Sequence, residues 1–423
     1  MQRLILTMLL SVATFSIAAA QVVRGKVTDE AGEALPRAHI SIAGGTGGTI
    51  TNLQGDFELL LPAPEAELEI RYVGYKTFTR TVYDGEVLAI RMEQNSVGLQ
   101  MVVIRDLNPD ELLQRAIDRI PENHKGTPFT VDGFYRLVAR SQENPDTLLH
   151  ISEAAYQWYR PGSSKNKDQL RLFRTRQERD ITVFNGNTEV FFAMRPKSLM
   201  QMDPTRLSAG GILSKKGLRQ HDFKLIGQVD FQGEPSYQYE FDQVDGLKKS
   251  RYRGRFWIHT ESLAFLGFDI SRSPKGMPFW KVEDLGQRTL MKLVDIHQVL
   301  QTDSVAIRYR KVGSRWMLED VAAKAGMRLY SGRNDFDFRT VAYVDFSLSR
   351  MDTTAVEPFP ADEVLAKNAW IEQVDSPDDP DFWKDYQIVL PDLSYEKEAV
   401  LIRRRNEVWM KASEAEGTEE IEE

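Results

Sequence analysis

The stretch VVRGKVTDEAGEALPRAHISIAGGTGGTITNLQGDFELLLP, residues 22–62, decides the fold of the N-terminal part of the chain. Short runs rich in Val, Ile and Phe alternate with turns that contain Gly, Asp and Asn, a pattern typical of antiparallel strands. Further runs of the same kind follow. We therefore predict seven strands, at residues 22–28, 38–42, 50–53, 57–61, 66–72, 75–83 and 86–92. Seven strands in about seventy residues close as two small sheets packed face to face.

Together with IRYVGYKTFTRTV at residues 70–82, residues 22–62 resemble the carboxypeptidase-regulatory-like domain of Bacteroidetes envelope proteins. The resemblance covers about seventy residues and implies a seven-stranded, transthyretin-like β-sandwich. This domain is named after an accessory part of zinc carboxypeptidases, so the resemblance implies no peptidase activity. The same module precedes the plug and barrel of many outer-membrane receptors, but those receptors are far longer than this chain.

The first twenty residues, MQRLILTMLLSVATFSIAAA, have the composition of a secretory signal peptide. One early cation, Arg3, precedes an apolar run that ends in three alanines, a small-residue site for signal peptidase. We expect cleavage after Ala20 and export to the periplasm or the outer membrane. No later run reaches the roughly 20 apolar residues that a transmembrane helix needs, so we expect no transmembrane segment after cleavage. The chain has no cysteine, which excludes disulfides and a lipid-modified cysteine.

Beyond the sandwich, the sequence predicts a larger antiparallel β-rich domain with a few helices, so the fold class is mainly β. A short helix precedes this domain, with Asn108 as its capping residue and Pro109 in its first turn. Its apolar stripe consists of Leu112, Leu113, Ala116, Ile117 and Ile120. Strands are predicted at residues 129–140, 147–159, 169–176, 237–241, 254–258, 265–271, 298–312, 316–322, 327–330 and 342–349.

The predicted domain limits follow from these elements. Residues 1–20 are the signal peptide, 21–95 the sandwich, 96–125 a connector strand and helix, 126–395 the β-rich domain, and 396–423 a C-terminal helix and acidic tail.

The β-rich part carries two further resemblances. Residues 111–136 and 379–391 resemble an uncharacterised region that follows the sandwich in a group of Bacteroidetes envelope proteins. Residues 253–265, RGRFWIHTESLAF, are similar to a hairpin of lipoprotein-carrier and related half-barrel proteins. The second resemblance implies an open, curved sheet with a helix in its concavity, a shape suited to lipid or to an apolar segment of a client protein.

The charge of the chain argues against nucleic acid as a partner. The formal net charge is -8, and the tail Ser413–Glu423 carries six glutamates and no cation. The remainder is close to neutral and lacks the basic stripe that polyanion binding needs. We interpret Arg403-Arg404-Arg405 as the solvated face of a C-terminal helix, and we expect disorder beyond Ala412.

One motif points to metal chemistry. His150-Ile-Ser-Glu153 has a spacing found in zinc carboxypeptidases, and His259 is a possible third ligand. The surrounding run reads as a strand, however, and the common hydrolase signatures are missing. The glycine-dense loop at residues 44–49 leads into a strand, whereas a phosphate-binding loop leads into a helix. We therefore predict no catalytic residues, no metal and no cofactor, with a zinc-dependent hydrolase as an alternative.

Aromatic residues provide another alternative, a glycan-binding surface protein. Such a platform would use Trp158, Tyr159, Trp257, Trp280, Trp316, Trp370 and Trp383. In a large β domain, however, most tryptophans pack in the core. We predict a non-enzymatic, exported envelope protein that acts as a docking or binding module for an outer-membrane protein client, a lipid or another apolar ligand.

Overall fold

The computed structural model describes most of the chain beyond the predicted signal peptide, which lies outside the described residues. The connector strand expected at residues 97–104 and Trp370 also lie outside them. The described ranges are residues 21–45, 47–95, 108–124, 128–162, 168–184, 202–207, 211–282, 285–354, 356–366, 369, 379–386 and 395–422. Within these ranges, no helix is long and apolar enough to span a membrane.

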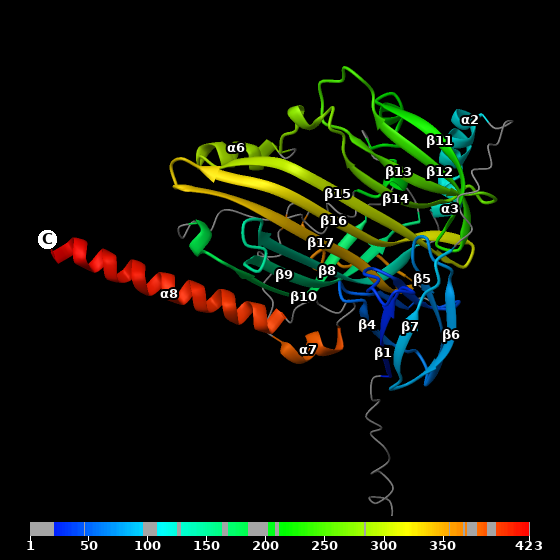
Figure 1. Ribbon diagram of the computed structural model, residues 1–423, viewed down its shortest axis with the longest axis horizontal. Helices are drawn as coiled ribbons and strands as arrows, with labels where there is room; N and C mark the ends of the chain where they lie inside the picture. The colour runs from blue at the N-terminus through cyan, green and yellow to red at the C-terminus, as the bar shows by residue number, and fades with distance from the viewer. Residues whose placement is uncertain are drawn as a thin grey trace, which may run out of the picture.

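The N-terminal part is the predicted seven-stranded sandwich (Figure 1). A three-stranded sheet, β4-β1-β7, packs on a four-stranded sheet, β3-β2-β5-β6, around an apolar core. The strands are β1 (Val22–Thr28), β2 (His39–Ile42), β3 (Gly48–Ile50), β4 (Asp56–Leu60), β5 (Glu65–Arg71), β6 (Phe78–Tyr83) and β7 (Val87–Arg91). The mainly β fold class is therefore confirmed.

The second part is one ten-stranded antiparallel sheet in the order β10-β9-β8-β17-β16-β15-β14-β13-β12-β11. Its strands are β8 (Phe129–Ser141), β9 (Leu148–Arg160), β10 (Gln169–Arg179), β11 (His221–Phe231), β12 (Glu234–Gln243), β13 (Tyr252–His259), β14 (Phe265–Arg272), β15 (His297–Val312), β16 (Arg315–Ser331) and β17 (Phe336–Asp352). Directly opposed residues share a face of such a sheet. We call the two faces inner and outer.

The inner face is apolar across the whole sheet. One row of directly opposed residues runs through eight strands, and all its members are buried: Ala154, Tyr135, Phe346, Val321, Ile307, Phe268, Phe256 and Tyr239. Helices α2 (Pro109–Asp118) and α3 (Ile120–His124) pack on this face through the predicted apolar stripe. Helix α2 contacts β11 and helix α3 contacts β16, five places away in the sheet. The sheet therefore curves around the helix pair, as the resemblance of residues 253–265 implies.

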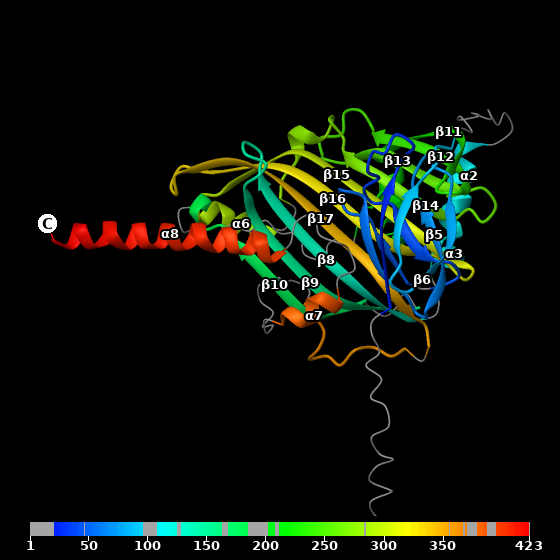
Figure 2. The same ribbon diagram turned by 60° about the horizontal axis from the view of Figure 1, so that its bottom comes forward.

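The outer face is covered by the sandwich and by two C-terminal helices (Figure 2). Helix α7 (Pro380–Asp385) places Trp383 against Phe134, and the first turns of α8 (Tyr395–Glu422) pack Ala399 and Ile402 on β9. The remaining short elements are η1 (Thr182–Phe184), η2 (Pro204–Arg206), α5 (Lys215–Leu218), η3 (Met277–Phe279) and α6 (Leu285–Leu293).

Four expectations need correction. Strand β11 was not predicted, because its polar alternation is that of an edge strand. Residues 316–322 and 327–330 belong to one strand, β16, whose Ala- and Gly-containing middle is held by pairing on both sides. Helix α8 continues to Glu422, so the residues beyond Ala412 are helical. Arg405 is not simply solvated: its Nε donates to Asp180 Oδ2 at 2.7 Å, which holds α8 on the sheet.

Gly133 provides a test of the inner-face packing. The Tyr156 ring lies over Gly133, stacks on Phe346 at a centroid distance of 4.8 Å, and its hydroxyl donates to the Ser347 carbonyl. A Cβ at residue 133 would overlap that ring. We predict that Gly133→Ala lowers the free energy of unfolding by about 1–3 kcal/mol, measured by urea denaturation.

Gly332→Ala is the matched control. Its Cβ would meet no heavy atom closer than 3.8 Å, so we expect a change within about 0.5 kcal/mol. Equal effects of the two substitutions would contradict the packing described for Tyr156.

Candidate functional site

The sandwich is attached to the outer face through an arginine on a tight turn. Arg37 has a left-handed backbone conformation, φ 63°, and its amide donates to the Thr51 carbonyl at 3.0 Å. The Thr51 hydroxyl accepts from the Ala38 amide at 2.8 Å and donates to the Leu35 carbonyl at 2.6 Å. These contacts hold a conformation that costs about 1–2 kcal/mol for a non-glycine residue. The turn therefore fixes the direction in which Arg37 projects.

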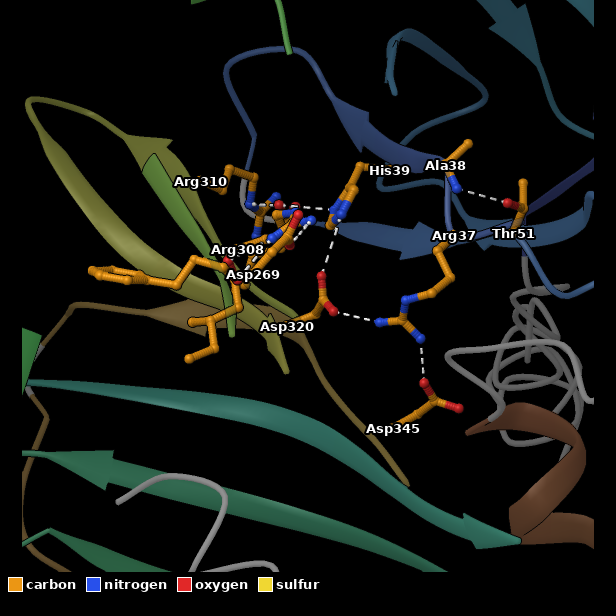
Figure 3. Close-up of polar contacts among 12 residues, drawn as sticks. Arg37, Ala38, His39, Thr51, Asp269, Arg308, Arg310, Asp320 and Asp345 are labelled. Carbon is orange, nitrogen blue, oxygen red and sulfur yellow. Dashed lines mark hydrogen bonds and ion pairs between the residues drawn. The ribbon is translucent and has the colours of Figure 1, made fainter. Parts of the chain in front are cut away.

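The Arg37 guanidinium bridges two strands of the sheet. It donates to Asp320 Oδ2 on β16 at 2.5 Å and to Asp345 on β17 (Figure 3). Burial disfavours its charge, but the two carboxylates outweigh burial and raise the pKa of Arg37 above its usual range. The contact is charge-assisted on both sides, which makes it one of the stronger polar contacts available to a protein.

A second set of buried charges lies beside Arg37. His39 on β2 is 3% exposed, with Nδ1 3.0 Å from Glu319 Oε2 and Nε2 3.2 Å from Asp320 Oδ1. Arg310 on β15 lies 3.4 Å from Glu319 Oε1 and donates to the Gly47 carbonyl at 3.2 Å. The glycine-dense loop thus brings the sandwich backbone close to the sheet, and it binds an arginine of this chain.

A cavity of about 850 Å³ lies next to this junction, on the outer face of the sheet. The sandwich contributes Arg37 and residues 50–54, and α8 contributes Glu398. The strands contribute Arg136, Val138, Arg140, Leu148, Ile151, Asp269, Ile270, Ser271, Ser304, Val305, Ala306, Ala322, Ala323, Lys324, Tyr343 and Asp345, and the β8–β9 hairpin contributes Pro145 and Asp146. The cavity therefore requires both parts of the chain.

The floor of the cavity lies where a row of charged residues on the outer face is interrupted. Directly opposed outer-face residues alternate in sign across the sheet, and two alanines interrupt the alternation. The row reads Arg176, Glu153, Arg136, Asp345, Ala322, Ala306, Asp269, Arg255, Glu240 and Lys224. We call Ala322 and Ala306 the alanine gap. Methyl side chains leave the sheet uncovered there, while the sandwich and α8 form walls at the sides.

Several charged residues around the gap are already paired. Arg308 donates to Asp269 Oδ1 at 2.7 Å, and Arg136 donates to Glu153 Oε1 at 2.6 Å. Lys324 lies over the Tyr343 ring, 5.3 Å from its centroid. The lining thus presents an apolar floor between the paired residues Asp269 and Asp345, an arrangement suited to binding an apolar group.

The structure does not bring the candidate zinc ligands together. His150 and Glu153 are three residues apart on β9, so their side chains lie on opposite faces of the sheet. Burial lowers the pKa of His150 to about 3, while Glu153 is fully buried between Arg136 and Arg176. His259 lies in the β13–β14 hairpin, where its Nδ1 contacts Ser262. Within the described residues, no group of three possible metal ligands occurs.

The tryptophans do not form a surface platform in the described part of the chain. Trp158, Trp257, Trp316 and Trp383 are buried, and Tyr159 is 3% exposed. Trp280 is half-buried in the segment after η3. These aromatic residues serve mainly as core packing, which was the simpler of the two interpretations.

Sequence reasoning missed the residues that join the two parts. Glu319 and Asp320 stand in the otherwise apolar run Trp316–Ala323, and adjacent acids inside a buried strand require cationic partners. That signal predicts a buried ion pair, but Arg37, the partner of Asp320, lies 283 residues earlier in the chain. Only the folded topology brings them together.

Comparisons with known proteins were made for both sequence and structure. No curated protein matches the sequence. Among solved structures, the chain is similar to an outer membrane lipoprotein-sorting protein domain from Vibrio parahaemolyticus, with 10% identity and a TM-score of 0.25 over 58% of this chain and 93% of that chain. A DUF1329 family protein from Desulfovibrio piger shows 13% identity and a TM-score of 0.22, over 58% and 92% of the two chains. Lipovitellin shows 8% identity and a TM-score of 0.24, over 56% and 26%.

The family comparison concerns the N-terminal part alone. The model of the CarboxypepD_reg-like domain matches residues 23–104, a range that contains six complete strands of the sandwich and nearly all of β1. The sandwich of this chain is therefore a carboxypeptidase-regulatory-like domain.

Proposed function

We propose that this chain is an exported, non-enzymatic envelope protein that binds a lipid or a similar apolar ligand between its sandwich and its sheet. The observation that carries the proposal is the alanine gap, where a row of alternating charges is interrupted beneath a cavity of about 850 Å³. Cavities of about 300–1,000 Å³ are typical of small-molecule sites. An apolar chain laid across Ala306 and Ala322 would displace water without leaving a charge unpaired.

The lining also suggests how a ligand would be oriented. Next to the alanine gap, Ile151, Val138 and Tyr343 are directly opposed across three strands and extend the apolar surface toward α8. Lys324 continues the same row and is exposed. A polar or anionic head group would therefore meet Lys324 at the rim, while the apolar part occupies the floor.

The geometry supports binding rather than catalysis. Beside the alanine gap, Asp345 and Asp269 are held in ion pairs with Arg37 and Arg308, and His150 and Glu153 lie on opposite faces of the sheet. A catalytic site needs an acid, a base or a nucleophile that converges on one point beside the ligand. The lining residues of this cavity offer steric and apolar complementarity instead.

Filling the alanine gap tests the proposed site. We predict that Ala322→Phe weakens binding of the neutral apolar dye N-phenyl-1-naphthylamine by about tenfold or more, as expected for overpacking that costs 1–3 kcal/mol. The dye is measured by its fluorescence in titrations with the purified mature chain. Phenylalanine at residue 322 would project into the cavity, so far-UV circular dichroism should stay unchanged.

The matched control is Ala89→Phe, an exposed position on β7 of the sandwich that does not line the cavity. This variant should bind the dye like the unaltered chain. Dye binding that is equally strong in both variants would place the apolar site elsewhere and refute the proposal.

A separate prediction concerns export of the chain. If residues 1–20 are a signal peptide, the protein recovered from the periplasm or outer membrane begins at Gln21, and its intact mass lacks those residues. The measurement is mass spectrometry of the envelope fraction. Replacing Ala18 and Ala20 with Leu should block cleavage. If the unaltered chain were found uncleaved in the cytoplasm, the predicted export would be contradicted.

A further inference from the structure

Helix α6 packs on the core with one side and presents leucines to solvent on the other. Met291 and Val294, the residue after the helix, pack against the main apolar core. On the opposite side, Leu285 is 67% exposed, Leu290 49% and Leu293 67%. At about 100° per residue, these three leucines fall within one face of the helix, about 140° wide. A helix that covers a core normally has a polar outer face, so α6 departs from the usual pattern.

The turn between β16 and β17 holds α6 in this orientation. Arg333 Nη1 donates to the Leu293 carbonyl at 2.9 Å, and Asn334 Nδ2 donates to the Val294 carbonyl at 2.9 Å. The Arg333 amide donates to Asp295 Oδ2, also at 2.9 Å. Carbonyls at the end of a helix have no partner within the helix, so these bonds satisfy them. The leucines are therefore presented by a helix that is anchored at its C-terminal end.

Cations border the leucines of α6. From Leu285 to Leu293 the helix contains two cations, Arg288 and Lys292, and no acid. Arg288 is half-buried and Lys292 is exposed. The exposed Arg333 is a third cation, and its bond to the Leu293 carbonyl places it beside that leucine. The exposed face of α6 is thus apolar with a basic border.

This combination fits a lipid surface better than a protein partner. A stable protein interface buries about 800 Å² on each side, far more than three leucine side chains on a nine-residue helix provide. A membrane interface needs no partner of complementary shape. An amphipathic helix lies in it with the apolar side among the head groups and the cations near anionic lipids.

The position of α6 leaves the rest of the molecule clear of such a surface. Helix α6 lies at the end of the long strands β15, β16 and β17 that points away from the sandwich (Figures 1 and 2). None of the residues that line the cavity belongs to α6. Contact through α6 would therefore leave the cavity and the sandwich uncovered.

We propose that α6 attaches the chain to the surface of a membrane that contains anionic lipid. Its leucines enter the head-group region, and Arg288, Lys292 and Arg333 face the lipid phosphates. The attachment is peripheral and reversible, because one short helix binds far more weakly than a helix that spans the bilayer. It is independent of any ligand in the cavity.

Sedimentation with sucrose-loaded vesicles measures this attachment. The purified mature chain is mixed with vesicles of equimolar phosphatidylcholine and phosphatidylglycerol. We expect binding that falls about tenfold or more when Leu285→Gln and Leu293→Gln are combined, because two apolar side chains no longer enter the lipid. Leu401→Gln is the matched control: Leu401 is 52% exposed on another helix, α8, and this variant should bind like the unaltered chain.

The cations are tested separately. Lys292→Gln should weaken binding to the mixed vesicles about fivefold and leave binding to pure phosphatidylcholine vesicles unchanged. Lys216→Gln, at an exposed lysine on α5, is the matched control and should have no effect. Raising the salt concentration from about 0.1 M to about 1 M should also weaken binding to the mixed vesicles, because the charges are then screened.

A chain that does not sediment with the mixed vesicles would overturn the proposal, and so would a double leucine variant that binds as well as Leu401→Gln. A dimer in vesicle-free solution that the same double variant abolishes would assign α6 to contact between copies of the chain instead. If circular dichroism shows that the double variant does not fold, Leu285→Gln alone replaces it and should still weaken binding. Dye binding in the cavity should stay unchanged in these variants, which distinguishes failure of the attachment from failure of the ligand site.

Discussion

The constraint on which the structure depends is that buried charges need partners of opposite sign. Glu319 and Asp320 are adjacent acids on a strand in the middle of the ten-stranded sheet, and they are 8% and 1% exposed. Arg37 of the sandwich supplies the charge that Asp320 requires, Arg310 faces Glu319, and His39 of the sandwich lies beside both acids. A carboxylate buried without such partners would destabilise the chain by several kcal/mol. This requirement fixes where the sandwich sits on the sheet.

The position of the sandwich in turn creates the cavity. On the inner face of the curved sheet, α2 and α3 pack against the apolar core. Part of the outer face is covered by the sandwich, α7 and α8, and the alanine gap lies between the sandwich and α8. Two small side chains and two covering elements therefore produce a site that neither part of the chain would have alone.

The sequence predicts local structure well and long-range contacts poorly. The seven strands of the sandwich, the capped helix at Asn108 and most strands of the sheet follow from hydrophobic periodicity and turn residues. Strand β11 was missed because of its polar alternation at the edge of the sheet, and the middle of β16 was missed because pairing with neighbours, and not propensity, holds Ala325 in a strand. The site was not predictable, because the sequence alone does not show that Ala322 and Ala306 lie directly opposite each other between paired charges.

The central claim is that a lipid or similar apolar ligand occupies the space between sandwich and sheet. Native mass spectrometry of the mature protein, purified from its own envelope without detergent exchange, tests this claim most directly. We predict a bound apolar molecule at one per chain in the unaltered protein, and its loss in Ala322→Phe but not in Ala89→Phe. A chain that is recovered empty, or a ligand that is retained equally by both variants, would contradict the account.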